Sequence, residues 1–239
     1  MKWNLLALLA TPLIVMGCDN QQPKDKVENI LLTDPSEAAG SAPQADATVI
    51  LALGDSLFAG YGLAPGQSYP AHLEAALKAR GIPARIVNAG VSGDTTSGGL
   101  TRVDFVLKSM PKPPALVIIS LGGNDMLRGV PPAETRKNLE AMLAKFKAAK
   151  VPVLLLGMLA APNLGADYAA QFNPIYPALA RKYGATLVPF WLQPLIGHPE
   201  LVQADHIHPT LPGIDLLVGA TVDQVAKALP PRPAPPAPR

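Results

Sequence analysis

Short runs of Val, Ile and Leu alternate with segments of helical character through the middle of the chain. The runs lie at 48–53, 85–88, 116–121, 153–157 and 186–190, and each is nearly continuous in apolar residues. Strands with one face in water alternate apolar and polar residues, whereas strands buried on both faces do not. Because strand and helix alternate, we predict an α/β fold, a three-layer α/β/α domain with a five-stranded parallel sheet.

Four helical segments are predicted around these strands. The segment 68–80 starts with a serine suited to N-capping and stops before a glycine. The segments 133–150 and 213–229 carry apolar residues along one side. A further apolar stripe at 172–179 contains two prolines, which predict a kink or an irregular start.

The composition is that of a chain that can bury a core. Of 239 residues, 49% are apolar and 16% are charged, so the chain is not disordered overall. Lys and Arg number 20 and Asp and Glu 18. Neither sign forms a block along the globular part, so a nucleic-acid-binding surface is not supported. The single cysteine excludes an internal disulfide and a cysteine-built metal cluster.

The beginning of the sequence resembles the leader of a bacterial lipoprotein. A positive start precedes the apolar run 5–16, which is shorter than the about 20 residues of a membrane span. The segment 15–18 resembles a lipobox, in which cleavage before the cysteine leaves a thiol that carries a diacylglycerol. We therefore expect 1–17 to be a signal peptide and Cys18 to be lipidated, giving an exported, periplasmic protein anchored at a membrane surface. The alternative is an ordinary signal peptide with an incidental cysteine, which leaves a soluble periplasmic or secreted protein.

Polar segments flank the predicted domain. Residues 18–46 follow the leader with acidic residues, Gln, Pro, Ser and Ala, a composition that cannot bury enough apolar surface to fold alone. We expect this segment to be a flexible tether. Residues 230–239 contain six prolines, which favour an extended polyproline II tail. One domain is therefore expected at 47–229.

Polar, glycine-rich turns follow three of the predicted strands. They lie at 54–57, 88–94 and 122–125, and a fourth polar segment at 205–209 comes near the end of the domain. Each is weak evidence alone, because a serine or an asparagine after a strand is usually a turn or cap residue. Ligands of parallel sheets gather beyond the carboxyl ends of the strands, so the four segments together predict a functional site there.

Taken in this order, the four segments resemble the sequence blocks of the SGNH subfamily of GDSL hydrolases, and within it the bacterial arylesterase and multifunctional thioesterase/lysophospholipase group. The blocks match at Ser56, Gly90, Asn124 and His208, and the resemblance extends over 49–229. It implies a flavodoxin-like SGNH hydrolase fold and a monomer without cofactor or metal. It also implies hydrolysis of small-molecule or lipid esters, with thioesters and lysophospholipids among the substrates.

The resemblance assigns the nucleophile to Ser56, the base to His208 and the orienting acid to Asp205. A serine hydroxyl needs a neighbour to take its proton, and a histidine, with an ordinary pKa of about 6.5, suits that task. A carboxylate on the second ring nitrogen fixes the tautomer. Asp94 and Asp125 are alternative acids, but both lie beside an expected oxyanion donor, and we expect them to organise loops.

Three donors are implied for the carbonyl oxygen of the substrate: the backbone N–H groups of Ser56 and Gly90 and the side-chain amide of Asn124. Attack on the ester puts negative charge on that oxygen, and losing one donor of this kind costs roughly 10²–10³ in rate. The alternative is that the glycine and the asparagine only form turns.

His206 departs from the family pattern, which often has glycine after the acid. Together with Asp205 and His208 it could instead form a metal site, because two imidazoles two residues apart in an extended loop can share a face. We expect no metal and place the His206 ring at the rim of the site.

Two apolar loops beside the expected site suit an acyl or aryl group, one after Asn124 and one after the fourth predicted strand. The expected substrate-binding residues are Met126, Leu127, Met158, Leu159, Leu164 and His206. Two other functions stay open. One is an esterase for O-acetyl groups of envelope carbohydrate, against which the 5% aromatic content argues mildly. The other is a non-catalytic envelope lipoprotein, which the undamaged family blocks disfavour.

Overall fold

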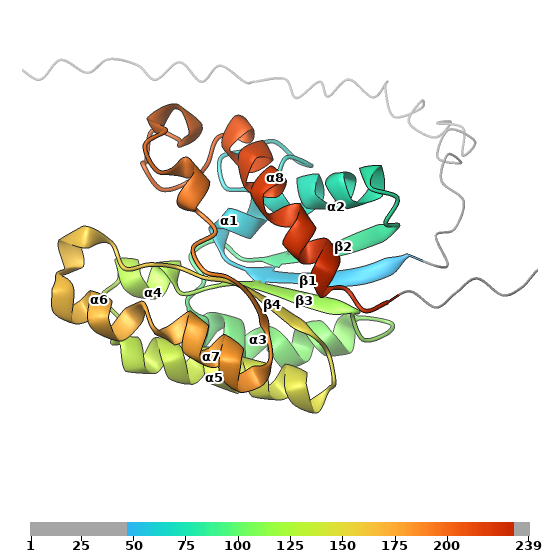
Figure 1. The fold of residues 1–239 in the computed structure, drawn as a ribbon, viewed down its shortest axis with the longest axis horizontal. Coiled ribbons are helices and arrows are strands. Elements are labelled where there is room, and N and C mark those ends of the chain that lie inside the picture. The colour runs from blue at the N-terminus through green and yellow to red at the C-terminus, as the bar shows by residue number, and fades with distance from the viewer. Residues whose placement is uncertain (1–46, 232–239) are drawn as a thin grey trace, which may run out of the picture. The chain divides into compact units, whose positions relative to one another are not determined.

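Figure 1 shows the computed structural model of the chain, which describes residues 47–231. The expected signal peptide, Cys18 and the expected tether lie outside the described residues, as does the tail beyond residue 231. The boundaries predicted for these segments therefore stay predictions.

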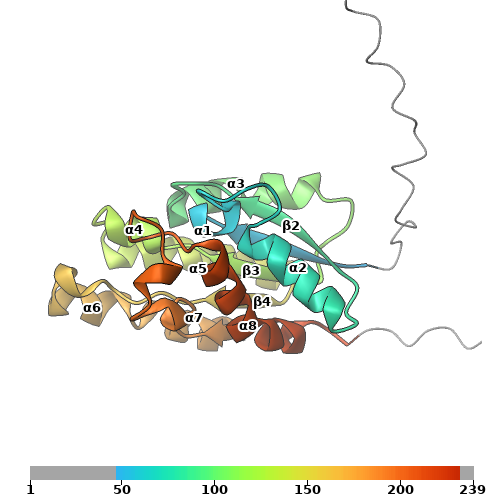
Figure 2. The ribbon, with the colours of Figure 1, turned by 90° about the horizontal axis from the view of Figure 1, so that it is seen from above.

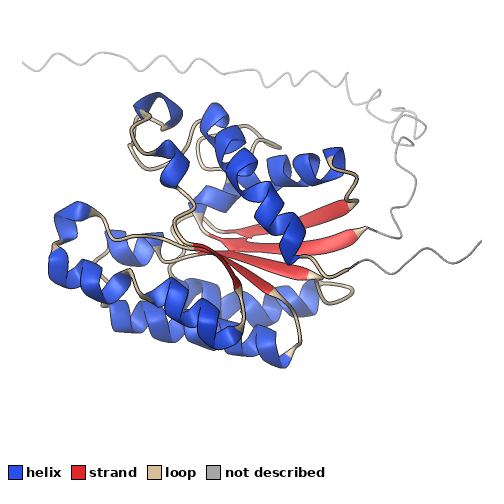
Figure 3. Ribbon diagram, in the orientation of Figure 1, coloured by secondary structure: helices blue, strands red, loops and turns tan. Residues whose placement is uncertain are grey.

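A five-stranded sheet forms the middle layer of the domain (Figure 3). Every neighbouring pair of strands is parallel, in the order β2-β1-β3-β4-β5. All five predicted strands are confirmed, and β3 and β4 are buried along their whole length because helices cover both faces. The strands are β1 (Thr48–Gly54), β2 (Ala84–Gly90), β3 (Leu116–Ser120), β4 (Val153–Leu156) and β5 (Thr186–Val188).

Long helices cover the two faces of the sheet (Figure 1). On one face, α2 (Tyr69–Ala79) and α8 (Leu211–Ala228) pack against each other, and Figure 2 shows them side by side over the strands. The other face carries α3 (Thr96–Ser109), α5 (Pro132–Ala148) and α7 (Ile175–Tyr183). The architecture is the predicted three-layer α/β/α fold with flavodoxin-like strand order.

Shorter helices complete the connections. The irregularity predicted at the two prolines is confirmed, because α6 ends at Phe172 and α7 begins only at Ile175, with Pro174 between them. No helix within residues 47–231 has the length and apolar character to cross a membrane. The short helices are α1 (Ser56–Ala59), α4 (Gly123–Leu127), α6 (Ala166–Phe172), η2 (Pro162–Leu164), η3 (Gln193–Leu195) and η4 (Pro199–Leu201).

Helix α3 is an element that we did not predict. It contains a glycine pair, Gly98 and Gly99, in its first turns, where glycine is unfavourable for a helix. Thr95 offsets this by capping the helix, since its side chain accepts the N–H of Gly98. A Cβ at Gly99 would lie 2.4 Å from Leu121 Cδ1, so the small residue lets α3 approach the sheet.

The strand order reverses between β1 and β3, and this places the site. The chain leaves β1 for β2 on one side and returns to β3 on the other. The segments after β1 and β3 therefore diverge and leave a crevice between them. Ser56 begins α1 after β1, and Asn124 lies in α4 after β3, so both residues border this crevice.

A cluster of buried aromatic side chains packs α1 against the core. The ring of Phe58 stacks on Tyr69 with 5.4 Å between centroids, and Tyr69 meets Trp191 edge-on at 5.1 Å. All three side chains are buried, and the Tyr69 hydroxyl lies 2.7 Å from Thr221 Oγ1 of α8. The position of Ser56 is thus fixed by core packing.

Candidate active site

Ser56 stands on a tight turn between β1 and α1. Asp55 caps the helix, with its Oδ1 accepting the N–H of Leu57 at 3.0 Å. A Cβ at Gly54 would lie 2.6 Å from the Phe58 ring, so glycine permits the turn. Ser56 keeps 9% of its surface exposed, and its backbone N–H donates to no protein acceptor within residues 47–231.

The structure brings His208 and Asp205 to this serine from a loop more than one hundred residues away. His208 Nε2 lies 2.8 Å from Ser56 Oγ, and His208 Nδ1 lies 2.6 Å from Asp205 Oδ2. The N–H groups of Ile207 and His208 both donate to Asp205 Oδ1 at 3.0 Å. The backbone N–H of His208, followed by its ring and the N–H of Ile207, lowers the pKa of Asp205 to about 2. Hydroxyl, imidazole and carboxylate therefore form a continuous chain of contacts.

Gln203 ties the loop of His208 to the loop after α1. Its Nε2 donates to the carbonyls of Tyr61 at 2.8 Å and Pro209 at 2.9 Å. Its backbone N–H donates to the carbonyl of His208 at 2.7 Å. The Tyr61 ring in turn packs on the imidazole, with 4.4 Å between centroids. Sequence reasoning missed both Gln203 and Tyr61, because their contacts join segments far apart in the chain.

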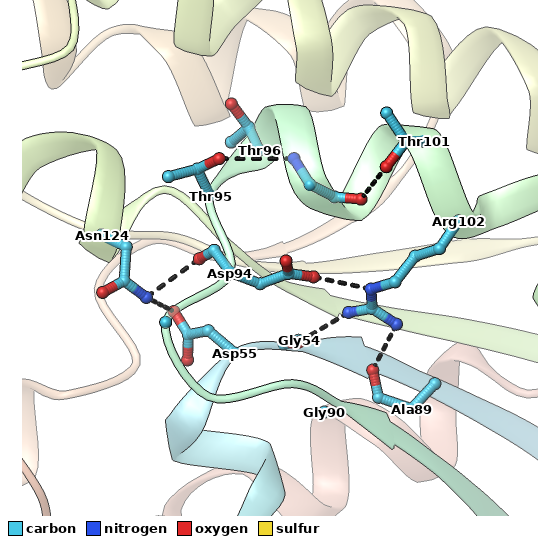
Figure 4. Close-up of polar contacts among 12 residues, drawn as sticks. Gly54, Asp55, Ala89, Gly90, Asp94, Thr95, Thr96, Thr101, Arg102 and Asn124 are labelled. Carbon is cyan, nitrogen blue, oxygen red and sulfur yellow. Dashed lines mark hydrogen bonds and ion pairs between the residues drawn. The ribbon is translucent and has the colours of Figure 1, made fainter.

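Asn124 projects from α4 into the same region (Figure 4). Its Nδ2 donates to the carbonyl of Asp94 at 2.9 Å and lies 3.4 Å from Asp55 Oδ2. Asp55 is only 2% exposed, and burial is the main reason that its pKa is raised to about 6, against the lowering effect of the Leu57 N–H. The amide of Asn124 is therefore held over a buried carboxyl group beside Ser56.

Gly90 does not lie where we expected an oxyanion donor. Its N–H donates to Asn88 Oδ1 at 2.9 Å, and the residue is not part of the pocket lining around Ser56. A Cβ at Gly90 would lie 2.4 Å from the nitrogen of Ala59 and 2.7 Å from the carbonyl carbon of Phe58. Gly90 is therefore needed for the close approach of β2 to α1, and its N–H is bonded to Asn88.

Gly93 lines the pocket instead. Its φ of 82° lies in the left-handed region that favours glycine, and its N–H donates to no protein acceptor within residues 47–231. The carbonyl of Gly93 accepts Arg128 Nη2 at 2.8 Å, which gives that arginine a structural contact. Both glycines belong to the polar segment 88–94, so the sequence marked the correct turn but not the residue.

The alternative acids have other partners. Asp125 is buried and accepts the backbone N–H of Thr96 at 2.8 Å, together with the hydroxyls of Thr96 and Thr135. Asp94 forms an ion pair with Arg102 at 2.6 Å. Neither carboxylate contacts His208, and both organise the loops beside Asn124.

A pocket of about 430 Å³ opens over Ser56 and His208. Of the expected substrate-binding residues, four line it and two, Leu159 and Leu164, do not. His206 lines it with a backbone φ of 60°, which is strained for a residue with a Cβ. The expected residues that line the pocket are Met126, Leu127, Met158 and His206, and lining residues that we did not expect include Leu57, Tyr61, Ser92, Ala161, Leu192 and Ile207.

The loop after β4 turns away from the pocket at Leu159, which explains why Leu159 and Leu164 do not line the pocket as predicted. Met158 is buried at the end of the strand, whereas Leu159 is 42% exposed. Leu164 closes the short helix η2, beyond Ala161, the residue of this loop that reaches the pocket. Within residues 47–231, no group of three or more His, Cys, Asp or Glu side chains is placed to hold a metal ion.

Comparison with known proteins places this constellation in a family. Residues 52–216 match the model of the GDSL-like Lipase/Acylhydrolase family. The chain belongs to this family. It is 44% identical over 168 residues to esterase TesA of Pseudomonas aeruginosa, covering 70% of this chain and 83% of that protein. It is 39% identical over 160 residues to an arylesterase of Vibrio mimicus, covering 67% and 79%.

Solved structures of family members agree with this assignment. AlinE4, described as an SGNH-hydrolase family esterase, is 59% identical, with a TM-score of 0.66 over 78% of this chain and 98% of that one. Esterase EstA from Pseudoalteromonas sp., in a structure inhibited by monoethylphosphonate, is 32% identical, with a TM-score of 0.70 over 75% and 97%. The SGNH hydrolase fold expected from the sequence is therefore confirmed.

Proposed function

We propose that the protein is a serine esterase that hydrolyses carboxylic esters with acyl or aryl groups, with thioesters and lysophospholipids as further substrates. The observation that carries this proposal is the 2.8 Å contact between Ser56 Oγ and His208 Nε2, with Asp205 on the other ring nitrogen. Relatives of this chain are named esterase, arylesterase and thioesterase/lysophospholipase.

In the first half of the reaction, Ser56 Oγ bonds to the ester carbonyl carbon while its proton passes to His208 Nε2. The carbonyl oxygen becomes an anion, and Asp205 stabilises the imidazolium through Nδ1. The C–O bond to the alcohol then breaks, and His208 gives its proton to the departing oxygen. In the second half, water bonds to the acyl carbon as it gives a proton to His208. The bond from that carbon to Ser56 Oγ then breaks, and His208 returns the proton to Oγ, which releases the carboxylic acid and regenerates the free serine.

Three donors are assigned to the anion: the backbone N–H groups of Ser56 and Gly93 and the amide of Asn124. The unpaired N–H groups of Ser56 and Gly93 border the same pocket as the Asn124 amide. One N–H of that amide has only a long contact, 3.4 Å to Asp55 Oδ2, which it can exchange for the anion, and this supports the set. It replaces Gly90, whose N–H is already bonded to Asn88. Donors held in place before reaction stabilise the transition state without reorganisation.

The pocket favours an apolar substrate. Its surface is mostly apolar, seven of its sixteen lining residues carry aliphatic or thioether side chains, and its rim includes large exposed apolar residues. An acyl chain that binds against this lining buries its methylene groups, and each buried methylene makes binding more favourable by about 0.8 kcal/mol. A lipophilic ester therefore matches this pocket better than an acetylated sugar. The apolar rim residues are Tyr61, Leu127 and Ile207.

We also propose that the protein is exported to the periplasm, where a lipid on Cys18 anchors it at a membrane surface. The proposal rests on the leader-like sequence 1–17 and the lipobox-like segment before the cysteine. Growth with a radiolabelled fatty acid should label the full-length chain, and Cys18→Ser should abolish the label and release the protein from membranes. Labelling that persists in Cys18→Ser would contradict the proposal.

The proposed activity is tested with aryl esters of increasing acyl length, a lysophospholipid and an acetylated sugar. Hydrolysis of the apolar esters, with weak activity on the sugar, is expected. A fluorophosphonate should label the wild type but not Ser56→Ala. Ser68→Ala is the matched control, because Ser68 is equally buried and also lies at the start of a helix, but its hydroxyl contacts Asn88 and no imidazole, and it should label normally. Labelling of Ser56→Ala, or no hydrolysis by the wild type, would overturn the proposal.

A further inference from the structure

Arg102 reaches from its helix to Asp94 and to the ends of β1 and β2 (Figure 4). It belongs to α3, and its side chain is 18% exposed. A guanidinium group holds its N–H donors in one rigid plane, so it can fix several acceptors relative to one another. A lysine cannot do this, because its charge is a single point on a flexible stem.

Each nitrogen of the Arg102 guanidinium has a different partner. Nε donates to Asp94 Oδ2 at 2.6 Å, Nη1 to the carbonyl of Ala89 at 2.7 Å, and Nη2 to the carbonyl of Gly54 at 2.8 Å. Gly54 ends β1 directly before the turn to Ser56, and Ala89 lies at the end of β2. The arginine therefore joins the ends of two strands to the loop that follows β2.

The same loop carries one of the proposed oxyanion donors and holds another by a hydrogen bond. Gly93 directly precedes Asp94, and the carbonyl of Asp94 accepts the Asn124 amide at 2.9 Å. A shift of Asp94 would therefore move the N–H of Gly93 and the amide of Asn124 together. Because donors must be held within about 0.5 Å of the productive geometry, a loosened loop weakens stabilisation of the anion more than binding of the neutral ester.

We propose that Arg102 is a positioning residue for ester hydrolysis, holding the loop of Gly93 and Asp94 on the ends of β1 and β2 so that the Gly93 N–H and the Asn124 amide face the oxyanion. This inference rests on the proposed esterase function. Arg102 does not line the pocket, and it acts through Asp94 and the two strand carbonyls.

The test compares Arg102→Met and Arg102→Lys with the wild type, using an aryl ester and a boronic acid that forms a tetrahedral adduct with the serine. Loss of one oxyanion donor costs roughly 10²–10³ in rate, so imperfect placement of two should lower kcat by about 10- to 100-fold in Arg102→Met, with KM changed less than about threefold. Affinity for the boronic acid should fall in parallel with kcat/KM. Arg102→Lys should lie between the two, since it keeps the charge but not all three contacts.

The matched control is Asp104→Asn, on the same helix, which removes an exposed ion pair with Lys145 away from the site. It should leave kcat and boronic acid affinity unchanged. Wild-type kcat in Arg102→Lys and Arg102→Met would overturn the inference, as would a rise in KM that accounts for the whole loss. If Arg102→Met does not fold, Arg102→Lys decides, because unchanged kcat and boronic acid affinity in that variant are sufficient to reject the inference. Ester hydrolysis by Ser56→Ala would reject the proposed function itself, whatever the Arg102 variants do.

Discussion

The carboxylate of Asp205 holds His208 by both its ring and its backbone. Oδ2 lies 2.6 Å from the ring Nδ1, while Oδ1 accepts the N–H of His208 at 3.0 Å. One side chain thus sets both the path of the loop and the orientation of the imidazole toward Ser56. Its pKa is lowered to about 2, chiefly by the backbone N–H of His208, so Asp205 carries its negative charge throughout the neutral range.

Replacing Asp205 by asparagine should therefore lower kcat by about 10²–10⁴, because the amide cannot stabilise the imidazolium as a carboxylate does. Glu200→Gln is the control, since Glu200 contacts His198 at 3.0 Å outside the pocket, and it should keep full activity. Steady-state kinetics on an aryl ester measure both.

The depressed pKa also sets the sign of a pH effect. The stability that Asp205 contributes is complete above its ordinary value of 3.8 and is lost as the pH falls through about 2. Asp205 should therefore not titrate in a kcat/KM profile measured from about pH 4.5 to about pH 9. Equal activity of Asp205→Asn and the wild type would contradict the assigned role.

Asp55 has the opposite linkage, and its replacement should expose a conflict between stability and activity. Its pKa is raised by burial from 3.8 to about 6, so stability is present at low pH and is lost as the pH rises through about 6. Above that pH the buried charge costs up to about 3 kcal/mol. Asp55→Asn keeps an oxygen for the Leu57 N–H and should raise Tm at pH 8 by roughly 5 °C. The gain at pH 4.5 should be only about one third as large, because the loss of stability begins above 3.8 and is complete above about 6.

Activity should fall in the same Asp55→Asn variant, by about tenfold or more, because the Asn124 amide loses a carboxylate neighbour beside the oxyanion donors. Calorimetry from about pH 4 to about pH 9 measures Tm across the titration of Asp55, and ester kinetics at about pH 8 measure the activity. Asp104→Asn, an exposed carboxylate on α3, should show no pH-dependent gain in Tm. A loss of Tm in Asp55→Asn that is equal at every pH would show that the buried charge is not the cause.

Gly90 should be required for the fold rather than for oxyanion binding. A Cβ there would overlap the backbone of Phe58 and Ala59, so Gly90→Ala should lower the free energy of unfolding by about 1–3 kcal/mol. Gly219→Ala is the control, because Gly219 lies in α8 with open space around it and should gain about 0.5–1 kcal/mol. Urea unfolding measures both changes, and an unaltered midpoint for Gly90→Ala would contradict the packing argument.

The sequence was most informative where local chemistry and burial agree. The continuous apolar runs located all five strands, and the polar segments at their ends located Ser56, Asn124 and the loop of His208. It failed where the answer depends on backbone direction. Gly90 and Gly93 look alike in a string of letters, yet only the path of the loop after β2 decides which N–H reaches the pocket.

Tertiary contacts account for the other misses. Helix α3 has a glycine pair that lowers its intrinsic helix propensity, and it forms because Thr95 caps it and because Gly99 packs closely on Leu121. The loop after β4 is apolar along its length, but Leu159 and Leu164 turn away from the cavity that Met158 reaches. The apolar character of a loop therefore predicts that its side chains are buried or make contacts, but it does not predict which cavity they line.

The selection of acyl length should depend on Leu127 and not on Leu159. Both leucines are exposed, at 56% and 42%, and both lie in loops beside the site, but only Leu127 lines the pocket. Removing three carbons from Leu127 should cost about 1 kcal/mol of contact with a long acyl chain, because each buried methylene is worth about 0.8 kcal/mol and the side chain is only partly covered. Leu127→Ala should therefore raise KM for an octanoyl ester by about fivefold and leave the acetyl ester unchanged. Leu159→Ala should leave the ratio of kcat/KM between the two esters at the wild-type value. An equal change in that ratio for both variants would mean that the acyl chain runs along the loop after β4, outside the cavity between Met126 and Met158.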